Sequence, residues 1–553
     1  MSSYKQAKEG FVSGGEGSSG SDIIAILCSL VLTHFLHRSL GVERRTRSAL
    51  RRMAVDFAVL VLPLLAIITV LGSRLWTCNL ILALSVLATR KASRGSDDSL
   101  LGSLDRAVIT SPPGRAPPTH PHDPRDKLHE RLEEPFLSSS QLQGAPATLR
   151  RRINEPHEHA FASPFPEATT PPRLRFHQPF LTVYRAQLML LTALSILAVD
   201  FTIFPRKFAK TESWGISLMD AGVGSFVFSL GIVSALPILN RSARIPPPLA
   251  IDLWRSTRRT LPLLILGLVR ILFVKGVDYP EHVTEYGVHW NFFFSLSILP
   301  TAGVLARRLY EATHLNLALL GVALAVVHQS VLRFHGVQEY VLSSAPRTTL
   351  LSANREGLAS LPGYVVIYVL GLSAGTYVLP SSPDFLARLV DQGQKTAAAR
   401  KAVGRQPGKA VVVYCSWTII WWTLFFLCQG FVSPPSRRLA NPTYCFWIAA
   451  NNMSLITAHC LVHQVLVPGP SFPHEPCPSR RGVDAPSDVP LTFEMINRNG
   501  LAIFLFANLL TGLVNLSVHS IYLLPLPAFF LLLSYALLIV LFAWSVRNTK
   551  ISL

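Results

Sequence analysis

Long apolar segments recur along the chain and alternate with short polar or basic connections. A helix needs roughly 20 apolar residues to cross about 30 Å of membrane hydrocarbon, and about thirteen segments come close to this. They are approximately residues 22–40, 53–72, 75–90, 181–204, 216–239, 260–276, 287–305, 315–334, 361–380, 410–432, 442–467, 499–521 and 524–545. This pattern predicts an all-α polytopic membrane protein with about thirteen transmembrane helices and no soluble domain.

The composition agrees with a membrane location. Hydrophobic residues make up 50% of the chain and the mean hydropathy is +0.36, which is more apolar surface than a soluble core needs to bury. The formal net charge is +19, but the basic residues flank apolar segments and do not gather with aromatic residues on one face, so we predict no nucleic-acid binding. Because the seven cysteines form no CxxC pair, we expect neither a disulfide framework nor a thiol-bound metal.

The basic residues are distributed unequally between alternate connections. One set of connections holds about 37 Lys and Arg residues, and the other set holds about 11. Cytosolic connections carry such an excess in membrane proteins. We therefore predict that the amino terminus lies outside the cytosol and the carboxyl terminus inside it, as an odd number of spans requires.

The connections divide the chain into five regions. Residues 1–90 form a lumenal tail and the first three helices, and residues 91–180 are a Pro/Ser/Arg-rich cytosolic insertion that we expect to be disordered. Residues 181–380 hold helices four to nine and the main lumenal motifs. A cytosolic linker at 381–409 precedes the last four helices, within 410–553.

The densest group of ionisable residues lies within residues 192–231. A charge at the bilayer centre costs roughly 2.5–3.5 kcal/mol, so ionisable residues in or beside spans are functional candidates. Asp200 lies near the lumenal end of one span, Asp220 opens the next, and Arg206 and Lys210 stand between them. Asp200 and Lys210 can face one pocket from two sides; alternatively, Asp200 ends a helix and Lys210 contacts lipid headgroups.

Three further blocks carry polar residues. Residues 274–294 include His282 and His289 in a short lumenal loop, and residues 352–375 begin near Arg355 and Glu356. In the fourth block, residues 496–518, a stripe of three polar residues follows one helical face: Asn508, Thr511 and Asn515. Such a stripe can join helices to one another or line a path for a ligand.

The histidines give little support for a metal site. His282 and His289 are seven residues apart and share a helical face only if the whole segment is helical, and the chain has no HExxH arrangement. His459 and His463 lie four residues apart inside a predicted span. Packing and hydrogen bonding explain that pair better than metal binding, so we predict no metal.

Taken together, the four blocks and the opening run YKQAKEGFVSGGEGSS at residues 4–19 resemble the signature regions of the glycosylphosphatidylinositol (GPI)-inositol acyltransferase family. The matching blocks are spread over nearly the whole chain, with a longer insertion at 91–180 than is usual for the family. The resemblance implies a multi-pass enzyme of the endoplasmic reticulum membrane. Such an enzyme moves a fatty acyl group, typically palmitoyl, from acyl-CoA to an inositol hydroxyl of glucosaminyl-phosphatidylinositol, without a permanently bound cofactor.

The resemblance also implies the catalytic residues. The family's essential Asp and Lys, ten residues apart, correspond to Asp200 and Lys210. We predict that Asp200 is a general base toward the inositol hydroxyl, and that Lys210 stabilises the oxyanion or holds the substrate phosphate. Four further residues are predicted to contact the substrate: Arg206, Asp220, His289 and Asn508.

Other classes of membrane protein remain as alternatives. A transporter or flippase of a lipid or lipid-linked substrate also has many spans and a few buried polar groups, but it predicts repeated halves with broken helices at matching places. The sequence shows no such symmetry. A non-catalytic scaffold would tolerate loss of Asp200 and Lys210. Membrane lipids are expected partners, and no protein partner is predicted.

Overall fold

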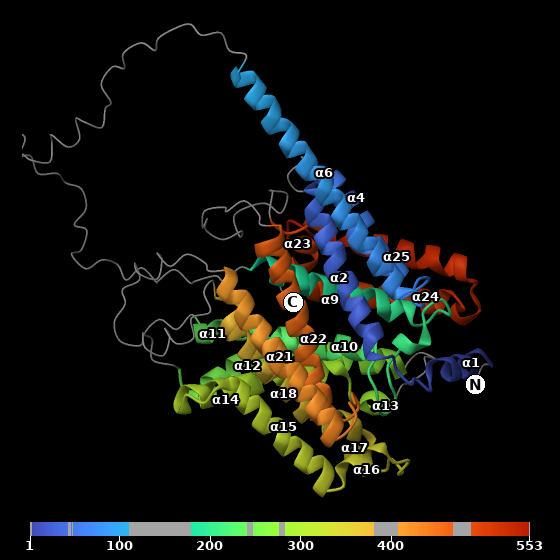
Figure 1. Ribbon diagram of the computed structural model, residues 1–553. Helices are drawn as coiled ribbons and strands as arrows, with labels where there is room; N and C mark the ends of the chain where they lie inside the picture. The colour runs from blue at the N-terminus through green and yellow to red at the C-terminus, as the bar shows by residue number, and fades with distance from the viewer. Residues whose placement is uncertain are drawn as a thin grey trace, which may run out of the picture. The chain divides into compact units, whose positions relative to one another are not determined.

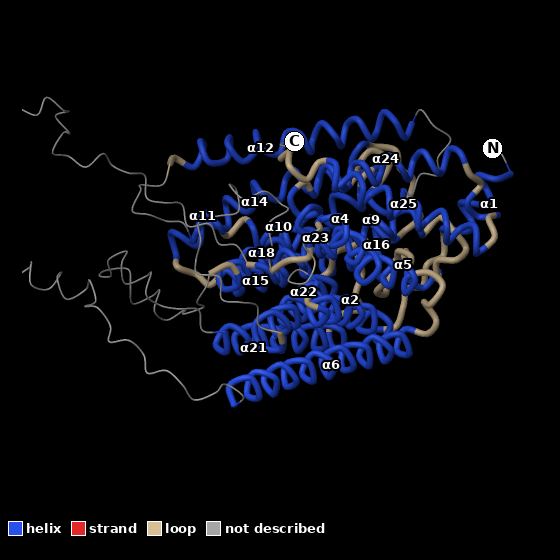
Figure 2. Tube along the Cα trace, turned by 90° about the horizontal axis from the view of Figure 1, so that it is seen from above, coloured by secondary structure: helices blue, strands red, loops and turns tan. Residues whose placement is uncertain are grey.

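The computed structural model describes residues 3–42, 46, 48–109, 178–239, 247–275, 283–380, 407–467 and 488–551. These residues form helices and loops, with no strand among them (Figure 1; Figure 2). The chain divides into two compact units, one formed by Met1–Lys91 with Leu174–Leu553 and the other by Ala92–Arg173. Helix α6 (Leu75–Ile109) supplies the described part of the second unit, so the predicted disordered insertion at 91–180 begins as helix and otherwise lies almost wholly outside the described residues.

The helices of the first unit follow one another through short loops. In the amino-terminal half they are α1 (Ser3–Val12), α2 (Gly20–Leu40), α4 (Ala49–Asp56), η1 (Phe57–Val61), α5 (Leu62–Ile68), α9 (Pro179–Ala198), η3 (Arg206–Phe208), α10 (Leu218–Val233), α11 (Leu236–Leu239) and α12 (Leu249–Lys275). In the carboxyl-terminal half they are α13 (Val283–Tyr286), α14 (Phe292–Thr313), α15 (Leu317–Phe334), α16 (Val337–Leu342), α17 (Leu350–Ala353), α18 (Arg355–Val378), α21 (Pro407–Phe431), α22 (Pro442–Leu461), η4 (Val462–Leu466), α23 (Leu491–Arg498), α24 (Gly500–Ser517), η5 (Ser520–Tyr522) and α25 (Pro525–Ser545).

The predicted polytopic membrane architecture is confirmed. Within the described ranges, 10 helices are long and apolar enough to cross a membrane, and each overlaps one of the predicted spans. The other three predicted spans, 53–72, 75–90 and 260–276, also lie on helices, namely the continuous run from α4 to α5, α6, and α12. Length and composition do not establish these three as spans, so the count of thirteen stays a prediction.

Three helices form the interior of the bundle. In α9, α18 and α22 between 72% and 78% of the apolar span is buried, whereas the figure is 17% in both α21 and α24. Helix α21 packs against α22 along its length and covers it on one side (Figure 1; Figure 2). The exposed apolar faces of the outer helices suit contact with lipid, where no apolar core is required to cover them.

Glycines allow α10 and α18 to approach closely. A side chain at Gly371 of α18 would collide with the carbonyl oxygen of Phe228, and one at Gly375 would collide with that of Ile232. In α10, Gly231 meets the carbonyl oxygen of Tyr368 in the same way. The spacing of Gly371 and Gly375 is the small-xxx-small pattern by which membrane helices bring their backbones together.

Several loops meet at one end of the bundle, which we call the Asp200 end. The loop of residues 199–217 joins α9 to α10 there, and its Gly215 N–H donates to the carbonyl oxygen of Pro435 in the loop that precedes α22. Residues 283–291 reach the same place, because Glu285 pairs with Lys210. Alternate helix ends therefore gather at this end the loops that carry most of the predicted site residues.

Candidate functional site

A cavity of about 690 Å³ opens at the Asp200 end. Its walls come from α2, α9, α10, α12, α22 and α24 and from the loops at 199–217 and 284–293. Apolar side chains of α2 and α9, among them Leu27, Leu30 and Leu191, line one part. Polar residues line another part: Asp200, Lys210, Thr211, Glu212, Glu285, His289, Arg437, Asn451, Asn452, Asn508, Thr511 and Asn515. The cavity thus offers one chamber to a ligand that has both apolar and polar parts.

The 199–217 loop is a fixed structure. Three aromatic side chains, Phe201, Phe204 and Phe208, are fully buried and anchor it in the apolar core. Pro205 stands before the short helix η3, and the Ser217 hydroxyl accepts the N–H of Asp220 to begin α10. Aromatic anchors therefore hold in place the backbone from which Asp200 and Lys210 project.

Asp200 is buried, with 3% of its surface exposed. Its Oδ2 accepts a hydrogen bond of 2.8 Å from the Asn515 amide, and its Oδ1 lies 3.4 Å from the Nζ atom of Lys8. Lys8 belongs to α1, so the carboxylate is held from the two distant segments α1 and α24. Asp200 and Lys210 both line the cavity, as the spacing predicted, but the recorded ion pair of Asp200 is with Lys8.

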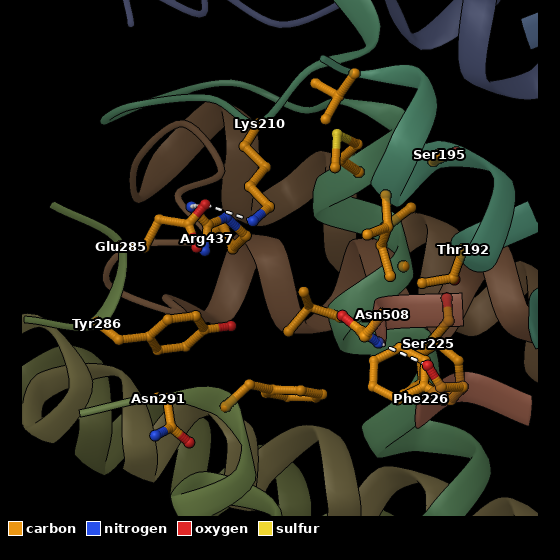
Figure 3. Close-up of a pocket in the computed structure, with 18 of the residues that line it drawn as sticks. Thr192, Ser195, Lys210, Ser225, Phe226, Glu285, Tyr286, Asn291, Arg437 and Asn508 are labelled. Carbon is orange, nitrogen blue, oxygen red and sulfur yellow. Dashed lines mark hydrogen bonds and ion pairs between the residues drawn. The ribbon is translucent and has the colours of Figure 1, made fainter. Parts of the chain in front are cut away.

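Lys210 lies against a different carboxylate. Its Nζ atom is 2.5 Å from Oε1 of Glu285, and its side chain is 34% exposed. Figure 3 shows this ion pair with Arg437 beside it; the guanidinium Nη2 of Arg437 is 3.9 Å from the same Glu285 oxygen. A lysine, an arginine and a glutamate therefore form a charged group on the cavity wall.

Arg437 is a cavity residue that the sequence analysis did not identify. Its side chain is 2% exposed, its Nε donates to Oδ1 of Asp220 at 2.7 Å, and its Nη1 has no hydrogen-bond partner in the part of the chain that the structure describes. Burial lowers the pKa of Arg437, but the charges of Glu285 and Asp220 outweigh it and hold the pKa well above its ordinary value. Arg437 is therefore a permanent cation with an unused donor in the cavity wall.

Two predicted substrate contacts do not line the cavity. Asp220 is fully buried, and its Oδ2 accepts hydrogen bonds from the backbone and hydroxyl of Thr211 and from the Ser217 hydroxyl. Arg206 donates to the carbonyl oxygen of Val199 at 2.7 Å and stacks on the ring of Phe11. Their geometry supports the 199–217 loop, so both residues act on the site through its framework.

The other two predicted contacts do line the cavity. His289 is held by its backbone N–H, which donates to Oδ1 of Asn354 at 2.8 Å. Asn508, Thr511 and Asn515 all line the cavity from α24, as expected for one helical stripe. His282 lies outside the described residues.

The remaining histidines and the third motif block make structural contacts. Nδ1 of His459 lies 3.1 Å from Nδ1 of His34, and His463 contacts Arg38, which agrees with the packing interpretation. In the third block, Glu356 is fully buried and receives hydrogen bonds from three guanidinium groups: Arg347, Arg355 and Arg438. Among the residues that the structure describes, no group of three or more His, Cys, Asp or Glu side chains could hold a metal ion.

Lys8, Glu285 and Arg437 complete the site without having been assigned to it from the sequence. Glu285 stands in a block that was singled out for its density of charge, and Lys8 stands in the opening run that carried the family resemblance. Arg437 gave no comparable signal, because it occupies a short loop together with Arg438 and resembles an ordinary basic flank of a span. Only the folded chain brings the three residues to the cavity.

Comparison with known proteins gives matches over the whole chain. The family model described as GWT1 matches residues 4–546. The chain is 36% identical over 572 residues to GPI-anchored wall transfer protein 1 of Aspergillus oryzae, with 100% of both chains covered. It is 36% identical to the protein of that name from Aspergillus fumigatus, covering 99% of this chain and 98% of the other. The protein of the same name from Cryptococcus neoformans var. grubii is 40% identical over 393 residues, which cover 68% of this chain and 63% of its own.

Proposed function

Because the chain belongs to the GWT1 family, we propose that it acts in GPI-anchor biosynthesis as a membrane O-acyltransferase. In this proposal it transfers a fatty acyl group, probably the 16-carbon palmitoyl group by family resemblance, from acyl-CoA to an inositol hydroxyl of glucosaminyl-phosphatidylinositol. The observation that carries the proposal is the cavity, in which a buried carboxylate and a lysine share walls with an apolar chamber. The volume of about 690 Å³ falls within the range of roughly 300–1,000 Å³ that is usual for ligand pockets.

Asp200 supplies the base for this reaction. An inositol hydroxyl is a poor nucleophile at neutral pH, and a carboxylate within hydrogen-bond reach can remove its proton as the oxygen attacks the thioester carbonyl carbon. General-base catalysis of this kind contributes about 10²- to 10⁴-fold. The carbon–sulfur bond then breaks and CoA leaves as a thiolate, which takes up the proton. Because a thiolate is a good leaving group, the reaction needs no strong general acid.

Lys210 and Arg437 supply positive charge on the same wall. The tetrahedral intermediate carries an oxyanion and the glycolipid carries a phosphodiester, and both are stabilised by preorganised cations or donors. Glu285 holds the Lys210 ammonium at 2.5 Å and so limits its motion. The unused Nη1 of Arg437 supports binding of the phosphodiester, which leaves Lys210 free to serve either anion.

We place the reaction in the endoplasmic reticulum membrane, with the Asp200 end toward the lumen. The loops at this end belong to the set with about 11 basic residues, and the opposite set has about 37. Acyl-CoA then reaches the cavity between the helices from the cytosolic side. No other cofactor enters the proposed reaction.

The test is transfer of radiolabelled palmitoyl from palmitoyl-CoA to glucosaminyl-phosphatidylinositol by the purified protein. We expect Asp200→Asn and Lys210→Ala each to lower the rate by at least about 10²-fold. Lys207→Ala is the matched control for Lys210→Ala, because Lys207 lies in the same loop but pairs with Asp22 outside the cavity. We expect the control to retain activity.

Two results would contradict the proposal. Full activity of both folded site variants would remove Asp200 and Lys210 from the mechanism. A folded wild-type protein that transfers no acyl group under varied lipid conditions would favour transport of a lipid-linked substrate, which a flippase assay in proteoliposomes then measures.

A further inference from the structure

The amino-terminal helix α1 sends a buried lysine into the site. Only 3% of the surface of Lys8 is exposed. Its Nζ atom lies 3.4 Å from Oδ1 of Asp200 and 3.1 Å from the amide oxygen of Asn515. The Asn515 nitrogen in turn donates to Oδ2 of Asp200 at 2.8 Å. Lys8, Asp200 and Asn515 therefore form a closed triangle in which each side chain contacts the other two.

The triangle engages both oxygens of the Asp200 carboxylate. The ammonium faces one oxygen and the amide faces the other, so rotation of the carboxylate about its Cβ–Cγ bond would break one of the two contacts. An ammonium buried without a partner is strongly unfavourable, so the folded chain retains Lys8 in this place only with its carboxylate and amide partners. The arrangement fixes both the orientation and the ionic partner of the residue to which we assign proton removal.

Helix α1 is fastened to the site by further contacts. The ring of Tyr4 lies 4.5 Å from that of His519, between their centroids, in the loop that follows α24. The ring of Phe11 lies 4.3 Å from the Arg206 guanidinium carbon in the 199–217 loop. These contacts lie on both sides of Lys8 along α1, so its position is set by packing as well as by charge.

The glycine-rich run after α1 binds the same loop through its backbone. The N–H of Gly14 donates to Oε1 of Glu212 at 2.9 Å, and the N–H of Glu212 donates to the carbonyl oxygen of Gly15. A side chain at Gly15 would collide with the carbonyl oxygen of Lys210. The absence of a Cβ at Gly15 is what allows this close approach.

We propose that Lys8 is a positioning residue of the acyl transfer, and that α1 is part of the active site. Lys8 acts through Asp200: with Asn515 it holds the carboxylate toward the cavity, where the acceptor hydroxyl is activated. This inference rests on the proposed function. A misplacement of a reacting group by about 1 Å can cost about 10²-fold in rate, so loss of Lys8 should affect turnover more than substrate affinity.

The experiment compares Lys8→Met, Lys8→Arg and Gln6→Met in the full-length purified protein, using the palmitoyl transfer assay. Lys8→Met should lower kcat by about 10²-fold and leave the KM for each substrate within about twofold. Lys8→Arg should recover most of the rate, because it restores the cation. Gln6 is exposed on the same helix, so Gln6→Met should behave as wild type.

A double-mutant cycle separates positioning from a general effect on folding. If Lys8 and Asn515 act through one carboxylate, Lys8→Met and Asn515→Leu should be strongly non-additive in kcat, because the first change already releases Asp200. Additive effects, an unchanged kcat in Lys8→Met, or a raised KM with normal kcat would each overturn the proposal. Failure of the wild type to transfer palmitoyl contradicts the proposed function instead, so the two failures are distinct.

Discussion

Buried carboxylates at the Asp200 end each lie against at least one cation. Asp200 pairs with Lys8, Asp220 with Arg437, and Glu356 with a group of arginines. The sequence analysis identified all three carboxylates, because an acidic residue beside an apolar span is conspicuous. It did not identify their partners, since each partner lies more than 80 residues away along the chain in two of the recorded pairs, Asp220 with Arg437 and Glu356 with Arg438. Local spacing reveals a buried charge but not the residue that neutralises it.

The Asp220–Arg437 pair should contribute strongly to stability. Both side chains are buried, with 0% and 2% exposed, so Asp220→Asn leaves the guanidinium without its closest counter-charge. We expect a loss of about 3–5 kcal/mol in the free energy of unfolding, measured by SDS titration in detergent micelles. Asp22→Asn is the control, because its pair with Lys207 is partly exposed and should cost less than about 1 kcal/mol. Equal losses in the two variants would contradict the structural role given to Asp220.

The helices themselves were largely predictable. Apolar length identified every helix that is long and apolar enough to cross a membrane, because lipid imposes one length on every spanning helix. The hydrophobic pattern also placed small residues of α10 in helix contacts, and Gly224 does meet the side chain of Ile448. It could not show that α18 is the main neighbour of α10, since packing partners are chosen by the three-dimensional fit of two surfaces.

The close contact of α10 with α18 should be sensitive to a single methyl group. In Gly371→Ala the new Cβ would overlap the carbonyl oxygen of Phe228, so the helices must move apart. We expect a loss of about 1–3 kcal/mol in the free energy of unfolding, again by SDS titration. Gly430→Ala in α21 is the matched control, because no atom lies within 4 Å of its new Cβ. A Gly371→Ala protein as stable as this control would contradict the packing described.

At the scale of the whole molecule, the folded chain brings together the loops that charge counting assigned to one side of the membrane. Loops near Lys210, Glu285 and Arg437 meet at the Asp200 end, and all belong to the set with few basic residues. The family prediction is also confirmed over the full chain. The boundaries of the cavity were not predictable, because its walls combine helices that are far apart in the sequence.

The predicted orientation can be measured directly in cells. Epitope tags at the two ends of the chain should differ in accessibility when only the plasma membrane is permeabilised. We expect the carboxyl-terminal tag to be stained under that condition, and the amino-terminal tag only after the endoplasmic reticulum is also permeabilised, because the basic loops favour the cytosol. The reverse pattern would place the Asp200 end in the cytosol and would require the acceptor glycolipid to be bound from that side.

The span of 507 residues between Lys8 and Asn515 has a consequence for the birth of the protein. A ribosome delivers α1 to the membrane first and α24 almost last, so the triangle around Asp200 cannot close until nearly the whole chain has been synthesised and inserted. Contacts of such high sequence separation form late and slowly. Nascent and truncated chains therefore hold Lys8 without the amide that completes its surroundings, and closure of the triangle marks the moment at which biogenesis ends and activity begins.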